Sequence, residues 1–140
     1  MRSPHLLRVE AEPVHFAPLI AAARGLGLRV GWLELGAHSE PVPEPLDAAA
    51  RFGALRAVSV GEDRTVAVKP RRGKAILRDL LREHFQGCAL VLVRGEIDAP
   101  SLRTEGDVWI VTSPEAASWR FTSEGLAAAL RRPRPWDTSA

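Results

Sequence analysis

The sequence predicts an α/β fold, a single domain in which helices pack on one mixed sheet. Strand-like apolar runs alternate with amphipathic helical stretches, and a strand, helix, strand order occurs twice along the chain. The length of 140 residues corresponds to about one domain, and the 46% hydrophobic and 26% charged content is typical of a globular chain. We therefore expect two βαβ units followed by a C-terminal hairpin and helix, with a ferredoxin-like α+β arrangement as the alternative.

The first predicted unit begins with a strand at residues 5–11, where apolar and polar side chains alternate loosely. Residues 15–25 are expected to form a helix that ends at Gly25, which stands where a left-handed C-terminal cap would lie. Residues 28–36 form the next predicted strand. The buried face of the helix is expected to consist of Phe16, Leu19, Ile20 and Ala23.

A loop, a short helix and a hairpin are expected in the middle of the chain. Residues 37–45 carry three prolines and two glutamates, which indicates an exposed, extended loop. Residues 45–53 have the pattern of a short helix with proline in its first turn and glycine past its end. The turn at residues 61–63 then joins two strands, residues 54–60 and 64–69, as a hairpin.

The second predicted unit runs from the strand at residues 64–69 through a helix at residues 73–87 to a strand at residues 88–95. The last strand is a compact run rich in valine and leucine, which suits burial on both faces of a sheet. A parallel crossover needs such an intervening helix, so this order favours a partly parallel sheet.

The C-terminal part is expected to begin with a polar loop at residues 96–107. A strand at residues 107–112, a short strand at residues 119–121 and a final helix follow. Thr122 or Ser123 would cap that helix, because both side chains can accept a hydrogen bond from its first free N–H groups.

The predicted single domain covers residues 1–132, and residues 133–140 are expected to be a loose C-terminal tail broken by prolines. Trp119 and Trp136 stand near arginines, a mixture that suits stacking on bases or covering a partner. The simpler interpretation is that Trp136 folds back onto the domain.

The most distinctive functional pattern lies between Lys69 and Phe85, where six basic residues stand against two acidic ones in a chain of net charge +2. A helix that begins near Gly73 would direct its unpaired N–H groups and the positive end of its dipole toward the same space as the neighbouring cations. The sequence therefore predicts an anion-binding site at the start of this helix. Its predicted residues are Arg71, Arg72, Gly73, Lys74, Arg78 and Arg82.

The same segment also has a plain structural interpretation. A helix on a sheet has an exposed face, and exposed faces are usually charged. Of the 19 basic residues only Lys69 and Lys74 are lysine. The arginine excess suits bidentate phosphate contacts, but a bias of genome composition produces it equally well.

No catalytic or metal motif stands out. A P-loop is excluded at the basic segment, since Val68 replaces its first glycine and Ala75 its Ser or Thr. The four histidines lack metal-ligand spacing, and the single Cys88 forms no intrachain disulfide. We therefore expect no metal and no cofactor, and the sequence favours a protein that is not an enzyme.

The leading functional interpretation is a non-catalytic binding module for an anionic partner, a nucleic acid or a phosphorylated small molecule. One alternative is a structural or protein-interaction subunit, in which the basic helix or the exposed strand edges contact an acidic protein or a second copy of the chain. The other is a small enzyme, which a pocket lined by His15 or His38 together with carboxylates would favour. With one cysteine and no apolar run of membrane-spanning length, we expect a cytoplasmic protein without a membrane partner.

Overall fold

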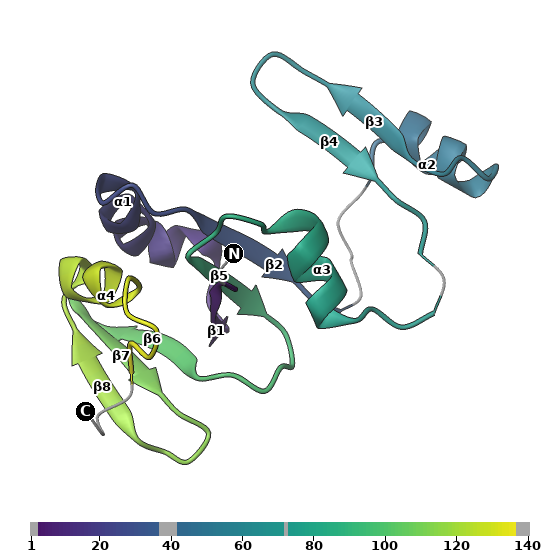
Figure 1. Ribbon diagram of the computed structural model, residues 1–140. Coiled ribbons are helices and arrows are strands. Elements are labelled where there is room, and N and C mark those ends of the chain that lie inside the picture. Colours follow the sequence, from purple (N-terminus) through teal and green to yellow (C-terminus); the bar gives the residue numbers. More distant parts are fainter. Residues whose placement is uncertain (1–2, 37–41, 72, 137–140) are drawn as a thin grey trace. The chain divides into compact units, whose positions relative to one another are not determined.

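The computed structural model describes residues 3–36, 42–71 and 73–136. The chain divides into two compact units (Figure 1). Met1–Gly36 together with Arg78–Ala140 form the first, called here the sheet unit, and Ala37–Leu77 form the second, the hairpin unit. Within the described ranges, no helix is long and apolar enough to cross a membrane.

The sheet unit is built on one six-stranded mixed sheet, so the predicted α/β class is confirmed. The strand order is β2-β5-β1-β6-β7-β8. The first four strands in this order run parallel, while β6, β7 and β8 form an antiparallel meander. The strands are β1 (His5–Val9), β2 (Val30–Glu34), β5 (Leu90–Arg94), β6 (Ser101–Glu105), β7 (Val108–Thr112) and β8 (Ser118–Phe121).

Helices α1 (Ala17–Gly25) and α4 (Ser123–Ala129) contact each other and share one hydrophobic core with the sheet (Figure 1). A short 3-10 helix, η1 (Pro13–Phe16), leads into α1 and buries Phe16. The predicted face of this region is confirmed, because Leu19 and Ala23 are also buried and Ile20 packs against the core. The left-handed residue after α1 is Gly27 rather than the predicted Gly25, which is the last helical residue.

Strand β5 lies at the centre of the parallel part, between β1 and β2. Leu90, Val91, Leu92 and Val93 are each 0% exposed, which confirms the predicted burial on both faces. At the C-terminus, Thr122 caps α4 by accepting a hydrogen bond from the N–H of Gly125 at 2.9 Å. The expected hairpin and helix are therefore present as β7, β8 and α4.

The hairpin unit consists of α2 (Glu44–Arg51) and an antiparallel pair, β3 (Ala57–Val60) and β4 (Thr65–Val68). This confirms the expected short helix and hairpin. The predicted second βαβ unit differs in detail, because β4 pairs with β3 in a separate two-stranded sheet and not with β5. The helix between them, α3 (Leu77–His84), thus follows the hairpin without joining two strands of one sheet.

Two further expectations need correction. The predicted polar loop at residues 96–107 contains strand β6, whose Leu102 is 3% exposed and whose other side chains are polar. The predicted helix at residues 73–87 begins only at Leu77, since Gly73 has a left-handed φ of 75° that an α-helix does not contain.

The end of the chain is described as far as Trp136, which packs against the core of the sheet unit. The Trp136 ring meets the His5 ring edge-on, with centroids 5.7 Å apart. Trp136 therefore folds back onto the protein, as the simpler interpretation held. The rest of the predicted tail, residues 137–140, lies outside the described residues.

Candidate functional site

The chain connections in the sheet point to the carboxyl ends of its parallel strands. From β1 the chain leads through α1 to β2, on one side of β5, whereas from β5 it leads to β6, on the other side of β1. Open α/β sheets bind ligands outside the carboxyl ends of their strands, where neighbouring connections leave in opposite directions. The residues that follow β1 and β5 are therefore the first place to look for a site.

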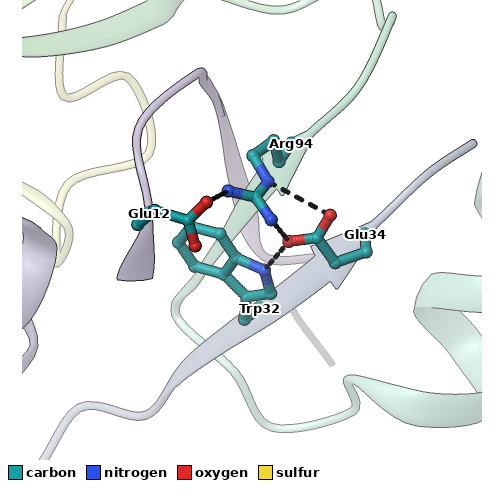
Figure 2. Close-up of polar contacts among 4 residues, drawn as sticks. All are labelled: Glu12, Trp32, Glu34 and Arg94. Atoms are coloured by element: carbon teal, nitrogen blue, oxygen red, sulfur yellow. Dashed lines mark hydrogen bonds and ion pairs between the residues drawn. The ribbon is translucent and has the colours of Figure 1, made fainter. Parts of the chain in front are cut away.

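Arg94, the last residue of β5, forms a network of polar contacts at this edge (Figure 2). Its Nε donates to Oε2 of Glu34 at 3.1 Å, and its Nη2 lies 2.7 Å from Oε1 of the same carboxylate. Its Nη1 lies 2.9 Å from Oε1 of Glu12. Trp32 Nε1 donates to Glu34 at 2.8 Å, and the Arg94 guanidinium lies 5.8 Å from the centre of the Trp32 ring.

This network links the ends of β2 and β5 to the segment after β1. Register pairs Glu34 with Arg94 on neighbouring strands, so the bidentate contact adds to the backbone ladder. Hydrogen bonds to Glu34 and then to Glu12 raise the pKa of Arg94 above its ordinary value. The three charged groups satisfy one another, which makes this edge a structural tie rather than an open anion site.

An open site lies on the other side of β1. A single bridge, between Arg8 and Ser101, joins β1 to β6, supported by a 2.8 Å hydrogen bond from Arg8 N–H to the Pro100 carbonyl. Beyond this bridge the two strands separate, and a pocket of about 350 Å³ lies there, called here the seam pocket. It is lined by Arg8, Glu10, Ala11, His15, Phe16, Ser101, Leu102, Arg103 and Thr104.

The polar groups of the seam pocket favour an anion. Arg8 and Arg103 bring positive charge, and Ser101 and Thr104 bring hydroxyl donors. The Nε of Arg8 is buried and has no hydrogen-bond partner among the residues that the structure describes. A buried donor without an acceptor costs about 1 to 3 kcal/mol, so a ligand oxygen reaching it would stabilise this arrangement.

Arg103 is partly occupied by the protein itself. Its Nη1 donates to Oε1 of Glu105 at 2.6 Å, and the more distant Arg120 lies 3.9 Å from the other carboxylate oxygen. The hydrogen bond from Arg103, followed by its charge, lowers the pKa of Glu105. The side chain of Arg103 is more than half exposed, so its guanidinium is accessible from solvent.

The predicted anion-binding residues lie apart from the seam pocket. Arg71, Gly73 and Lys74 are exposed and belong to the hairpin unit, whereas Arg78 and Arg82 are exposed on α3 in the sheet unit. Arg72 lies outside the described residues. Lys74 precedes α3, so of the predicted residues only Arg78 and Arg82 lie on this helix. The set itself stays a prediction.

The described part of the chain contains no group of three or more His, Cys, Asp or Glu side chains that could hold a metal ion. Cys88 is half-buried beside Gly31 and Phe85, where a thiol acts as a small apolar side chain. His38 lies outside the described residues.

The seam pocket was missed because its lining comes from two distant segments, residues 8–16 and 101–104. Only the strand pairing brings them together, and the second segment was expected to be a loop. One signal was present, since Gly106 and Asp107 form the two-residue connection between β6 and β7. A Gly-Asp pair between two strands is typical of a hairpin.

Comparison with known proteins gave no family assignment. No family model and no curated protein matches the chain. Among solved structures, two of Bacillus subtilis MobB match part of the chain. One has a TM-score of 0.49 and 20% identity over 70% of this chain and 65% of that chain. The other has a TM-score of 0.46 and 17% identity over 70% and 62%. The matched region thus spans less than two thirds of either MobB chain, and similarity at this level says nothing of what the present chain binds.

Proposed function

We propose that this chain is a non-catalytic binding module that holds a small anionic molecule in the seam pocket. The observation that carries the proposal is the buried, unpartnered Nε of Arg8 in a pocket that Arg103 also lines. The ligand would carry a phosphate or carboxylate group, because the planar guanidinium matches two oxygens of either group.

The size of the pocket supports a small molecule over a nucleic acid. A volume of about 350 Å³ lies in the lower part of the range of about 300 to 1,000 Å³ that small-molecule sites occupy. Nucleic-acid backbones are bound by extended basic surfaces with many phosphate contacts. The seam pocket offers two arginines and one carboxylate, Glu10, which suits a single anionic group.

The proposal is tested by titrating the protein with inorganic phosphate and with a panel of phosphorylated and carboxylated metabolites. Tryptophan fluorescence reports on this region, because the Phe16 ring of the pocket lies 5.8 Å from the Trp32 ring and 6.0 Å from the Trp109 ring. Arg8→Gln should weaken binding about tenfold or more, the usual effect of losing a hydrogen bond to a charged group.

Arg120→Ala is the matched control, since Arg120 is exposed on the same sheet but does not line the pocket. It should bind as the unchanged protein does. Saturable binding that Arg8→Gln leaves unaltered would refute the seam pocket. If Arg71→Ala with Arg72→Ala abolishes binding instead, the basic segment predicted from the sequence is the site.

A second candidate function rests on one observation. His15 and Glu10 line the same pocket, which is the combination of histidine and carboxylate that an enzyme with a site assembled from distant residues requires. Turnover of a panel compound that is lost in both His15→Ala and Glu10→Gln would favour an enzyme. Binding of the compound without turnover favours the binding module.

A further inference from the structure

The hairpin unit buries very little of its apolar surface. Among its described residues, only Leu46 and Ala57 are buried, at 7% and 8% exposure. Among the described residues, all but one of the exposed large hydrophobic side chains belong to this unit, the exception being Val14. The exposed members in the hairpin unit are Val42, Phe52, Leu55, Val58, Val60, Val66 and Ile76.

One face of the β3–β4 hairpin is uncovered. Register pairs Ala57 with Val68 and Ser59 with Val66 on one face, and Val58 with Ala67 and Val60 with Thr65 on the other. Helix α2 contacts both strands, and the buried Ala57 marks the face that it covers. On the opposite face, Val58 is 52% exposed and Val60 is 77% exposed.

The outer edge of β3 presents the backbone groups of these same valines. Gly61 N–H donates to the Arg64 carbonyl, which makes Gly61 and Arg64 a hydrogen-bonded pair at the end of the ladder. Because such pairs alternate along antiparallel strands, the N–H and C=O groups of Val58 and Val60 point away from β4. An exposed strand edge presents unpaired backbone groups with which a further strand can pair.

The β3 edge is complementary to itself. If β3 pairs antiparallel with β3 of a second copy about a two-fold axis at Ser59, Val58 of each copy stands opposite Val60 of the other. Arg56, which precedes β3, then lies near Glu62 in the turn that follows β3 of the other copy, and these opposite charges favour the pairing. The corresponding registers of β4 bring only the uncharged residues Thr65, Val66, Ala67 and Val68 together.

We infer that two copies of this chain associate through β3 and form a continuous four-stranded antiparallel sheet. The exposed valine face then runs across both copies, and the unpaired backbone groups of Val58 and Val60 find partners. The contact is isologous, so it closes at two copies and leaves the β4 edges outermost. This inference is independent of the proposed ligand site, which lies in the sheet unit.

The first test is sedimentation equilibrium of the full-length protein over a wide concentration range. The unchanged protein should show twice the monomer mass, with a concentration-dependent transition. Val58→Pro removes one outward N–H of β3 and should give a monomer. Ala67→Pro removes the matching N–H of its cross-strand neighbour on β4 and should leave the dimer intact.

A charge exchange tests the register without relying on a proline. Arg56→Glu alone places two acids near each other and should reduce the dimer fraction. The double variant Arg56→Glu with Glu62→Arg restores opposite charges and should restore the dimer. A double variant that stays monomeric overturns the two-fold register at Ser59.

A disulfide test gives a positive signal from the assembled state. In a Cys88→Ser background, Ser59→Cys should form a disulfide between copies on mild oxidation, because residues opposite each other in a non-hydrogen-bonded pair lie about 4.5 Å apart at their Cα atoms. Val60→Cys is the control, since it would face Val58 of the second copy and should not crosslink. A monomer at every concentration, with no crosslink at Ser59, overturns the inference.

Discussion

Strands β5 and β3 are both short and rich in valine, yet they lie in opposite environments. In β5 every residue from Leu90 to Val93 is 0% exposed, whereas in β3 Val58 and Val60 are more than half exposed. Strand β5 pairs on both sides, with β1 and β2, while β3 pairs only with β4. The comparison shows that a short valine-rich segment forms a strand in both places. Whether that strand is buried depends on how many strands pair with it.

The largest expected effect breaks the buried strand. Leu92→Ala removes a fully buried side chain and should lower the free energy of unfolding by about 2 to 5 kcal/mol, because a cavity remains in the core. Urea unfolding followed by tryptophan fluorescence measures it, since all four tryptophans lie in the sheet unit.

Val60→Ala is the comparison variant in β3. Measured on dilute protein, it should change the free energy of unfolding by no more than about 0.5 kcal/mol, as expected of an exposed side chain. Equal effects of the two variants would mean that Val60 is buried in solution and that the contrast between the strands is wrong.

A smaller effect is expected from a substitution in β2, at the position that packs against the Phe85 ring. A Cβ atom at Gly31 in β2 would lie 2.5 Å from the Phe85 ring that follows α3. Gly31→Ala should therefore destabilise the sheet unit by about 1 to 3 kcal/mol, the usual cost of overpacking. Thermal unfolding followed by tryptophan fluorescence checks this value.

Gly25→Ala provides the control for Gly31→Ala. A Cβ atom there meets nothing within 4 Å, and the residue ends α1, so alanine should be neutral or stabilise by up to about 1 kcal/mol. Destabilisation of the same size in both variants would show that loss of glycine, rather than contact with Phe85, is responsible.

The smallest expected effect concerns pH. The Arg103 hydrogen bond lowers the pKa of Glu105 below its ordinary value, so the folded state favours the charged carboxylate. Its contribution to stability is present above the unfolded pKa and is lost as the pH falls through the lowered folded value. Glu105→Gln should remove this acid-side dependence, measured by urea unfolding at a series of pH values, and added salt should reduce it in the unchanged protein. An unchanged acid-side slope in Glu105→Gln would contradict the assignment.

The parts of the fold that could be predicted are those whose signal is local. The apolar run of β5 and the cap of α4 are readable because burial on two faces and a free helix N-terminus each require particular residue types at adjacent positions. The start of α3 was predicted too early because a glycine such as Gly73 can either begin a helix or adopt the left-handed conformation that the structure shows. Strand β6 was missed because Leu102 is its only buried side chain, and one apolar residue makes no alternation.

The candidate site was less predictable than the fold. The sequence emphasised a cluster of cations that are neighbours along the chain, and the structure shows its described members exposed in two different units. Arg8 and Arg103 carried no sequence signal, because each is a single arginine in an ordinary strand. They line one pocket only because β6 lies beside β1, and a pairing between such distant segments leaves no local pattern.

The single bridge between Arg8 and Ser101 also bears on the mechanics of the sheet unit. Backbone hydrogen bonds tie the strands firmly within the parallel part and within the meander, but barely across the line that separates them. Across that line α1 packs against α4, and His5 Nε2 lies 3.0 Å from the Leu130 carbonyl oxygen. Arg131 Nη2 also donates to the Leu26 carbonyl at 2.9 Å. The parallel part and the meander are therefore joined by helix packing more than by strand pairing.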